Sequence, residues 1–127
     1  MKALLLAALL LLPAAAEAIT VTPTGATVDV QYTEPVTNAD GTPLGDLDHC
    51  NVYLTAGPAP EVKQPNVAAT RPQGGGTVTT NVAVTVPVGA VIDAVFAATC
   101  TDTSGNESAR SPAVTQRLDK LPPAAPR

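Results

Sequence analysis

The sequence predicts an all-β fold, a Greek-key β-sandwich of about seven short strands. Two observations lead to this prediction. Apolar and polar residues alternate over short segments, which is the period of a strand with one buried and one solvated face. Clusters of Gly, Pro, Asn and Asp separate these segments, as turns do in a sandwich. After Ala18, no segment has the period of an amphipathic helix.

The start of the chain has the features of a secretory signal peptide. Lys2 gives a positive start, residues 3–12 are an uninterrupted apolar run, and Pro13 ends it. The Ala-Glu-Ala sequence at residues 16–18 offers the small residues that signal peptidase needs, so we expect cleavage after Ala18. A buried core helix would explain the apolar run alone. We therefore expect residues 1–18 to be removed and the mature protein to be secreted or periplasmic, without insertion into a membrane.

The rest of the chain is expected to form one domain over residues 19–118, followed by a Pro/Ala-rich tail or linker over residues 119–127. Prolines remove backbone donors, so the tail is not expected to join a sheet. The net charge is −4, and the lysines and arginines are scattered. The chain thus lacks the electrostatic footprint of a nucleic-acid binder.

The alternation also places the individual strands. We expect strands at residues 19–21, 26–32, 49–55, around Val67, and at residues 77–86, 91–101 and 113–118. In the second of these strands Val28, Val30 and Tyr32 share one face, which is expected to be buried. The Gly triplet at residues 74–76 lacks the Lys-Ser/Thr of a phosphate loop and is expected to be a flexible hinge.

Cys50 and Cys100 are the only two cysteines. In an exported protein such a pair predicts a disulfide, because oxidising compartments make and keep these bonds. Two buried thiols are the alternative. A bridge would restrict the unfolded chain by roughly 4 kcal/mol, which matters in a chain with two Tyr, one Phe and no Trp.

Two stretches resemble exported bacterial fibronectin type III modules. Residues 102–108, Asp-Thr-Ser-Gly-Asn-Glu-Ser, follow an alternating strand and resemble the end of strand F with its F–G turn. Residues 35–53 resemble the B–C region of the family. The residues that carry this second likeness are Asn38, Asp40, Gly41, Thr42, Pro43, Leu44, Leu47, Val52 and Tyr53.

The resemblance implies a fibronectin type III or immunoglobulin-like sandwich. It places Cys50 on strand C and Cys100 on strand F, which are neighbours in one sheet of that fold, with both side chains in core-facing register. Two positions depart from the family pattern. Tyr32 stands where strand B usually has a tryptophan, and Ala94 stands where strand F usually has an aromatic residue. These departures put the packing of the core in doubt rather than the topology.

No catalytic site, metal site or cofactor is predicted. His49 is the only histidine and has no titratable partner at a recognisable spacing. Cysteines held in a disulfide supply no thiolate, and with one histidine they make a poor zinc site. The carboxylates Asp40, Asp46 and Asp48 share one loop, which is compatible with calcium, although their spacing matches no EF-hand. The other interpretation is that they cap turns.

We therefore expect a non-catalytic module that serves as a spacer, adhesion or protein-interaction domain with an unknown protein partner. The alternative is an accessory polysaccharide-binding module of the cell surface or of a secreted enzyme system, for which Tyr53 is the only exposed aromatic residue expected. An unrecognised hydrolase is a third hypothesis that no residue requires. Loops on rigid scaffolds carry most binding functions. The candidate binding residues in the loops are Asn38, Asp40, Asp46, Asp48, Asp102, Asn106 and Arg110.

Overall fold

The computed structural model describes residues 19–25 and 27–127, so the expected signal peptide lies outside the described residues. The described part of the chain consists of strands and connecting segments without a helix, which confirms the prediction of an all-β fold. Accordingly, these residues contain no helix long and apolar enough to cross a membrane.

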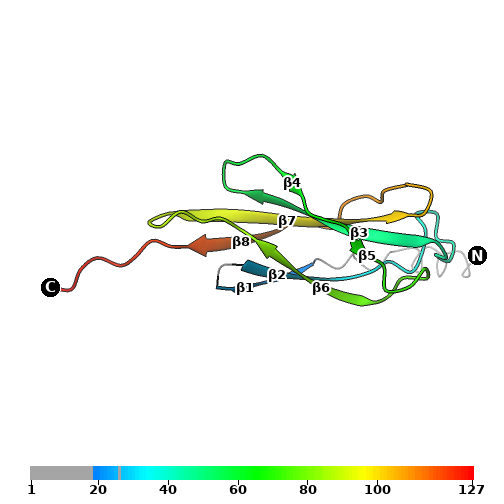
Figure 1. Ribbon diagram of the computed structural model, residues 1–127, viewed down its shortest axis with the longest axis horizontal. Helices are drawn as coiled ribbons and strands as arrows, with labels where there is room; N and C mark the ends of the chain where they lie inside the picture. Colours follow the sequence, from blue (N-terminus) through cyan, green and yellow to red (C-terminus); the bar gives the residue numbers. More distant parts are fainter. Residues whose placement is uncertain (1–18, 26) are drawn as a thin grey trace, which may run out of the picture.

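Eight strands form two antiparallel sheets (Figure 1). In chain order they are β1 (Thr20–Thr24), β2 (Thr27–Thr33), β3 (Leu47–Ala56), β4 (Val62–Lys63), β5 (Val67–Ala68), β6 (Thr77–Ala83), β7 (Val91–Asp102) and β8 (Val114–Asp119). The smaller sheet has the order β1-β2-β6, and the larger has the order β4-β3-β7-β8, with β5 also paired to β3. The chain thus crosses between the sheets three times, after β2, before β6 and after β6, as in a Greek-key sandwich.

The sheets lie as two layers along the long axis of the molecule, and the C-terminal tail extends away from one end (Figure 1). Side chains from both layers fill the space between them. Val28 and Val30 of β2 meet Val52 of β3 and Phe96 of β7 there, and none of the four is more than 1% exposed. The buried faces predicted for these strands are therefore confirmed, and so is the shared face of Val82, Val84 and Val86.

The edge of the larger sheet beyond β3 is one strand broken by an irregularity. Tyr53 pairs with Lys63 and Cys50 pairs with Val67, so three steps along β3 correspond to four along its neighbour. The extra residue falls near Pro65, which has no backbone N–H to donate. The sequence predicted only the strand at Val67, which is β5, and missed β4.

Cys50 and Cys100 are joined in a disulfide, with an S–S distance of 2.06 Å. They are direct partners in the β3–β7 register, so the bridge links neighbouring strands of one sheet. Cys50 is fully buried and Cys100 is half-buried. The predicted pairing is confirmed, and a disulfide of this kind fits an oxidising environment.

The Gly triplet is not a flexible hinge, and this expectation from the sequence was wrong. Gly74 is buried with a φ of +68°, and an added Cβ would lie 1.9 Å from the backbone oxygen of Pro35. Gly76 donates its N–H to the Glu34 carboxylate and accepts the Glu34 N–H. The triplet lacks side chains because its backbone packs against its neighbours and because Gly74 and Gly75 adopt a positive φ.

Glu34, which directly follows β2, is a buried carboxylate. Its side chain is 2% exposed and accepts hydrogen bonds from the backbone and hydroxyl of Thr70 and from the backbone of Gly76. Three donors on one carboxylate offset the cost of removing its charge from water. Glu34 therefore ties the end of β2 to the segment that precedes β6.

Candidate functional site

Tyr53 lies at the centre of the most extensive polar network on the outer face of the larger sheet. Its side chain alternates with the buried Val52 and Leu54, so β3 directs it away from the core, and its ring is half-buried. Its hydroxyl donates to Oε2 of Glu107 at 2.5 Å. The hydroxyl of Thr99 on β7 donates to the same carboxylate oxygen at 2.6 Å. Glu107 thus joins two strands to the segment that follows β7.

Two cations approach the Tyr53 ring from different segments. The guanidinium carbon of Arg110 is 4.1 Å from the ring centroid, and Nζ of Lys63 on β4 is 5.6 Å from it. Both distances lie within the range of cation–π attraction. Arg110 also donates through both terminal nitrogens to the two carboxylate oxygens of Glu61, at 2.5 and 2.6 Å. We call Tyr53, Glu61, Lys63, Thr99, Glu107 and Arg110 the Tyr53 cluster.

Hydrogen bonds within the Tyr53 cluster favour the ionised forms of Glu61, Glu107 and Arg110. The hydrogen bond from Arg110 lowers the pKa of Glu61, and hydrogen bonds from Thr99 and then Tyr53 lower the pKa of Glu107. The bond with Glu61 raises the pKa of Arg110. All three groups remain accessible to solvent, so these attractions order the surface more than they stabilise the fold.

The segment after β7 positions the cluster because it hydrogen-bonds to the edge of β7 as a neighbouring strand would. Ser108 donates its N–H to the oxygen of Cys100 at 2.8 Å, and its hydroxyl accepts the N–H of Cys100 at 3.0 Å. Ser111 makes the same pair of bonds with Ala98, both at 2.9 Å. Each serine therefore satisfies both backbone groups of one β7 residue. The two contacts flank Arg110 and hold it above the sheet.

This returning segment also covers the outer face of β7. Ala97, Thr99 and Thr101 are each no more than 8% exposed, although alternation assigns them to the solvent side.

Asn51 on β3 is another buried polar residue on this outer face. The amide of Asn51, which is 1% exposed, donates to the oxygen of Gln64 and to Oδ1 of Asn66. These bonds hold the irregular edge strand against β3.

The turn that begins at Asp102 is built by that residue's own carboxylate. One oxygen of Asp102 accepts the N–H groups of Ser104 and Asn106 at 2.9 Å, and the other accepts the Asn106 amide at 3.0 Å. These bonds lower the pKa of Asp102. Asp102 and Asn106 are thus occupied in shaping the turn, whereas Arg110 belongs to the Tyr53 cluster.

The loop that joins β2 to β3 uses its polar residues in a similar way. Asp40 accepts the N–H and hydroxyl of Thr42, which lowers its pKa, and the Asn38 amide donates to the same hydroxyl. Asp48 lies in β3 and not in the loop, contrary to the expectation from the sequence, and its carboxylate contacts Nδ1 of His49 at 2.7 Å. Asp40, Asp46 and Asp48 do not gather, and no group of three or more potential metal ligands occurs within residues 19–25 and 27–127. Capping of the turn accounts for Asp40.

The two loops that contain the candidate binding residues meet at one end of the molecule, where the N–H of Thr103 donates to the oxygen of Asp46 at 2.9 Å. The Tyr53 cluster draws only Tyr53 and Arg110 from the residues singled out in the sequence. Glu61, Lys63, Thr99 and Glu107 were missed, because their contacts join different strands and loops and no local pattern connects them.

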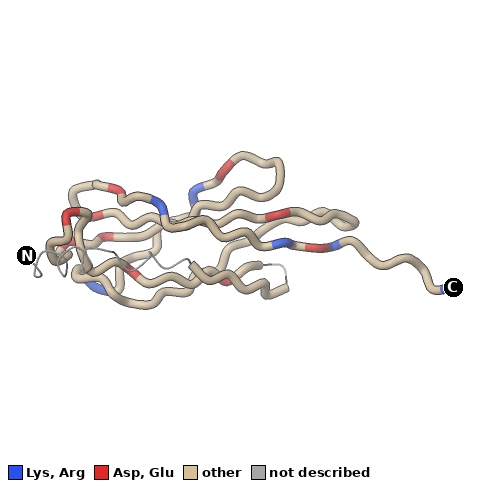
Figure 2. The backbone as a smooth tube through the Cα atoms, turned by 180° about the vertical axis from the view of Figure 1, so that it is seen from behind, with Lys and Arg blue, Asp and Glu red and all other residues tan. Residues whose placement is uncertain are grey.

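The cluster combines an aromatic ring with charges of both signs. Tyr and Arg are residue types enriched among the residues that contribute most to binding in protein interfaces, and here both are held in place by contacts within the chain. The other lysines and arginines among the described residues are spread over different parts of the molecule (Figure 2). The fold and this surface together define a disulfide-bonded β-sandwich module. Comparison with protein-family models, curated proteins and solved structures finds no match to the chain.

Proposed function

We propose that the chain is an exported, non-catalytic module of the fibronectin type III kind that acts as a protein-interaction domain through the Tyr53 cluster. The fold assignment is supported by the strand order. The orders β1-β2-β6 and β4-β3-β7-β8 correspond to strands A-B-E and C′-C-F-G, with Cys50 on C and Cys100 on F. Export is supported by the disulfide and by the features of residues 1–18.

The observation that carries the interaction proposal is the placement of Arg110 between Tyr53 and Glu61. A bidentate ion pair and a ring contact fix the guanidinium, so little side-chain entropy remains to be lost on binding. Lys63 and Glu107 add charges of both signs around it, which favours a partner surface with a complementary arrangement. A charged, preorganised face of this kind suits a protein partner.

The alternative of polysaccharide binding has less support. Sugar-binding sites stack pyranose rings on flat, accessible aromatic faces. The guanidinium of Arg110 lies over the Tyr53 ring, and the Tyr53 hydroxyl is engaged by Glu107. A sugar would have to displace a cation that is itself held by Glu61. A non-catalytic role agrees with the disulfide, since neither cysteine is available as a nucleophile.

The proposal is tested by site-specific photo-cross-linking of the exported protein in the cells that produce it. A photo-activatable phenylalanine analogue replaces Val62, which is 54% exposed on β4 beside the cluster, or Gln31, which is exposed on the other sheet. We expect a discrete protein adduct from position 62 and none from position 31.

Two charge variants test whether formation of the adduct depends on Arg110. R110E breaks the ion pair, whereas R110E/E61R restores an ion pair of reversed polarity and so controls for local folding. We expect both variants to lose the adduct from position 62. An adduct that persists in both variants, or equal adducts from the two positions, would contradict the proposal.

A further inference from the structure

Strand β6 is an open edge of the sandwich. It is the terminal strand of the smaller sheet, and β2 is its only neighbour there among the described residues. Its outward edge therefore presents backbone N–H and C=O groups that are free to pair with another strand. Its sequence, Thr-Val-Thr-Thr-Asn-Val-Ala over seven residues, contains no charge and no proline.

The other sheet edges carry features that oppose strand addition. Pro23 lies within β1, Arg117 and Asp119 lie on β8, and Pro65 interrupts the edge formed by β4 and β5. Proline and charge are the usual protections of an edge. On one side of the sandwich β1 and β8 also contact each other. The opposite side, between β6 and the β4–β5 segment, is left open.

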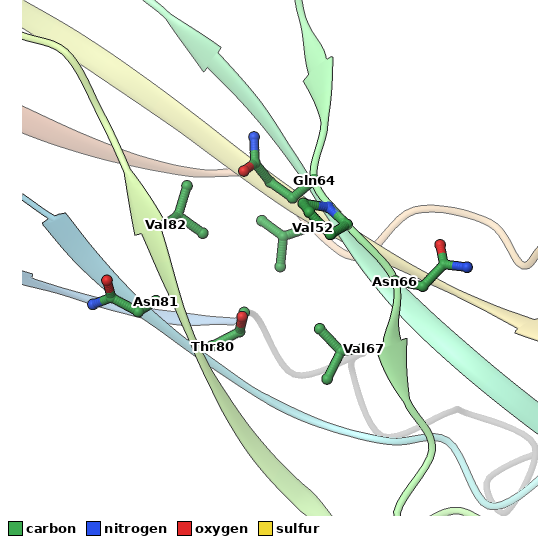
Figure 3. A pocket seen from close by; sticks show the side chains of 8 residues that line it. Val52, Gln64, Asn66, Val67, Thr80, Asn81 and Val82 are labelled. Carbon is green, nitrogen blue, oxygen red and sulfur yellow. The ribbon is translucent and has the colours of Figure 1, made fainter.

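A small cavity lies on this open side of the sandwich, between β6 and the β4–β5 segment. It has a volume of about 160 Å³ and lies between Thr80–Val82 of β6 and the segment from Gln64 to Val67, with Val52 of β3 also lining it. Figure 3 shows Val52 and Val82 between β6 and the segment that carries Gln64, Asn66 and Val67. A strand added to β6 would direct alternate side chains toward this cavity.

We propose that β6 pairs antiparallel with β6 of a second copy of this chain, giving a symmetric dimer with one continuous six-stranded sheet. The residues of β6 are self-complementary in the register that uses all seven of them, which is centred on Thr80. Val78 then faces Val82 of the second copy, and Thr80 faces Thr80. Pairs of β-branched residues and of threonines are favourable across strands, and no like charges meet.

The same register brings the second copy to the cavity. Val78 of that copy comes opposite Val82, on the side of the sheet where the cavity opens. Strand β6 is an uncharged stretch where two copies can approach. This inference is independent of the proposed function, because the Tyr53 cluster lies on the other sheet.

Sedimentation equilibrium of the purified exported protein at rising concentration tests the dimer. We expect the wild type to reach twice the monomer mass. The variant T79K/N81K places lysines opposite each other twice across the interface, while the lysine at 81 stays opposite Asp29 within the sheet. We expect the dimer to weaken by about tenfold or more. The matched control, T20K/T22K, adds the same charge to the other edge of the same sheet and should leave the dimer intact.

Cysteine cross-linking tests the register. Both native cysteines are oxidised, so an introduced thiol is free. We expect T80C to form a disulfide between copies under mild oxidation, because residue 80 faces itself. T79C should not, because residue 79 faces residue 81. A wild type that remains monomeric at every concentration, equal weakening by T20K/T22K, or equal cross-linking of both cysteine variants would overturn the proposal.

Discussion

Arg110 covers the ring of Tyr53, with its guanidinium carbon 4.1 Å from the ring centroid. The contact forms because the segment after β7 runs back along the edge of β7 that faces away from β3. From there the Arg110 side chain reaches over the outer face of the sheet to Tyr53 on β3. One consequence is that the only tyrosine directed away from the core has no free ring face on the side of Arg110.

Polysaccharide binding gives the first prediction. We expect the exported protein to remain in the supernatant when it is mixed with chitin, cellulose or peptidoglycan and centrifuged. The reason is the guanidinium of Arg110, which competes with any sugar for the ring. Y53A should sediment no differently from the wild type. Binding to one of these polymers that Y53A abolishes would favour the alternative function.

The second prediction concerns alkaline pH. Burial, together with the nearby charge of Glu34, raises the pKa of Tyr32 from 10.0 to about 12. Between these values the unfolded chain has lost the tyrosine proton while the folded chain keeps it, so stability is complete below pH 10 and falls toward pH 12. The loss should reach between about 2 and 3 kcal/mol, measured by urea unfolding across this range.

The variant Y32F controls for this effect. It removes the titrating group and a buried hydroxyl that has no hydrogen-bond partner. We expect equal or greater stability at neutral pH, because an unpaired buried hydroxyl is costly, and a smaller loss in alkali. An unchanged alkaline loss in Y32F would assign the effect to other groups.

The third prediction concerns the packed glycines. G76A should destabilise the fold by about 1–3 kcal/mol, since a Cβ there would lie 2.3 Å from the Thr70 hydroxyl and 2.9 Å from the Glu34 carboxylate. G45A is the matched control, because Gly45 has no positive φ and no atom within 4 Å of an added Cβ. We expect G45A to change the free energy of unfolding by less than about 0.5 kcal/mol. Equal effects in thermal unfolding would mean that the triplet is not tightly packed.

The disulfide gives the fourth prediction. The bridged cysteines are 50 residues apart, so replacing both in C50A/C100A should cost about 4 kcal/mol through the larger entropy of the unfolded chain. Urea unfolding of the wild type and the variant measures this cost. Intact mass with alkylation is the companion experiment, in which both cysteines should react only after reduction. A mass that begins at Ile19 would also verify the expected signal cleavage.

The fifth prediction concerns the serines beside Arg110. S108A/S111A removes the hydroxyls that accept the N–H groups of Cys100 and Ala98. We expect faster hydrogen exchange at these two amides and a loss of about 1 kcal/mol for each bond. S104A is the control, since the backbone N–H of Ser104 makes its contact with Asp102. Unchanged exchange in S108A/S111A would show that the backbone bonds suffice.

The sequence predicted the sandwich because alternation is a local signal. Val28, Val30 and Tyr32 on one strand, and Cys50 on another, lie on the faces that a period of two residues assigns. The burial of Thr99 was not predictable in this way, because it depends on a segment that returns over β7 from outside the strand pattern.

The candidate site was predicted only in part for the same reason. Tyr53 was found because it is aromatic and on the solvent side of its strand, and Arg110 because it lies in a loop. The contacts of Glu107 with Tyr53 and of Arg110 with Glu61 join positions 54 and 49 residues apart. The burial of Glu34 was not predicted, because its carboxylate turns inward toward Thr70, which is 36 residues away in the sequence.

Ser108 and Ser111 use their hydroxyls as a strand would use its backbone carbonyls, and they thereby fill the part of the β7 edge that β8 leaves unpaired. An added strand would find the N–H groups of Cys100 and Ala98 already hydrogen-bonded. Addition at that part of the β7 edge is blocked, while β6 on the other sheet remains open. A molecule with a single sheet edge open to pairing can form a dimer but cannot grow into a fibre, because fibre growth needs a second open edge that binds the next copy.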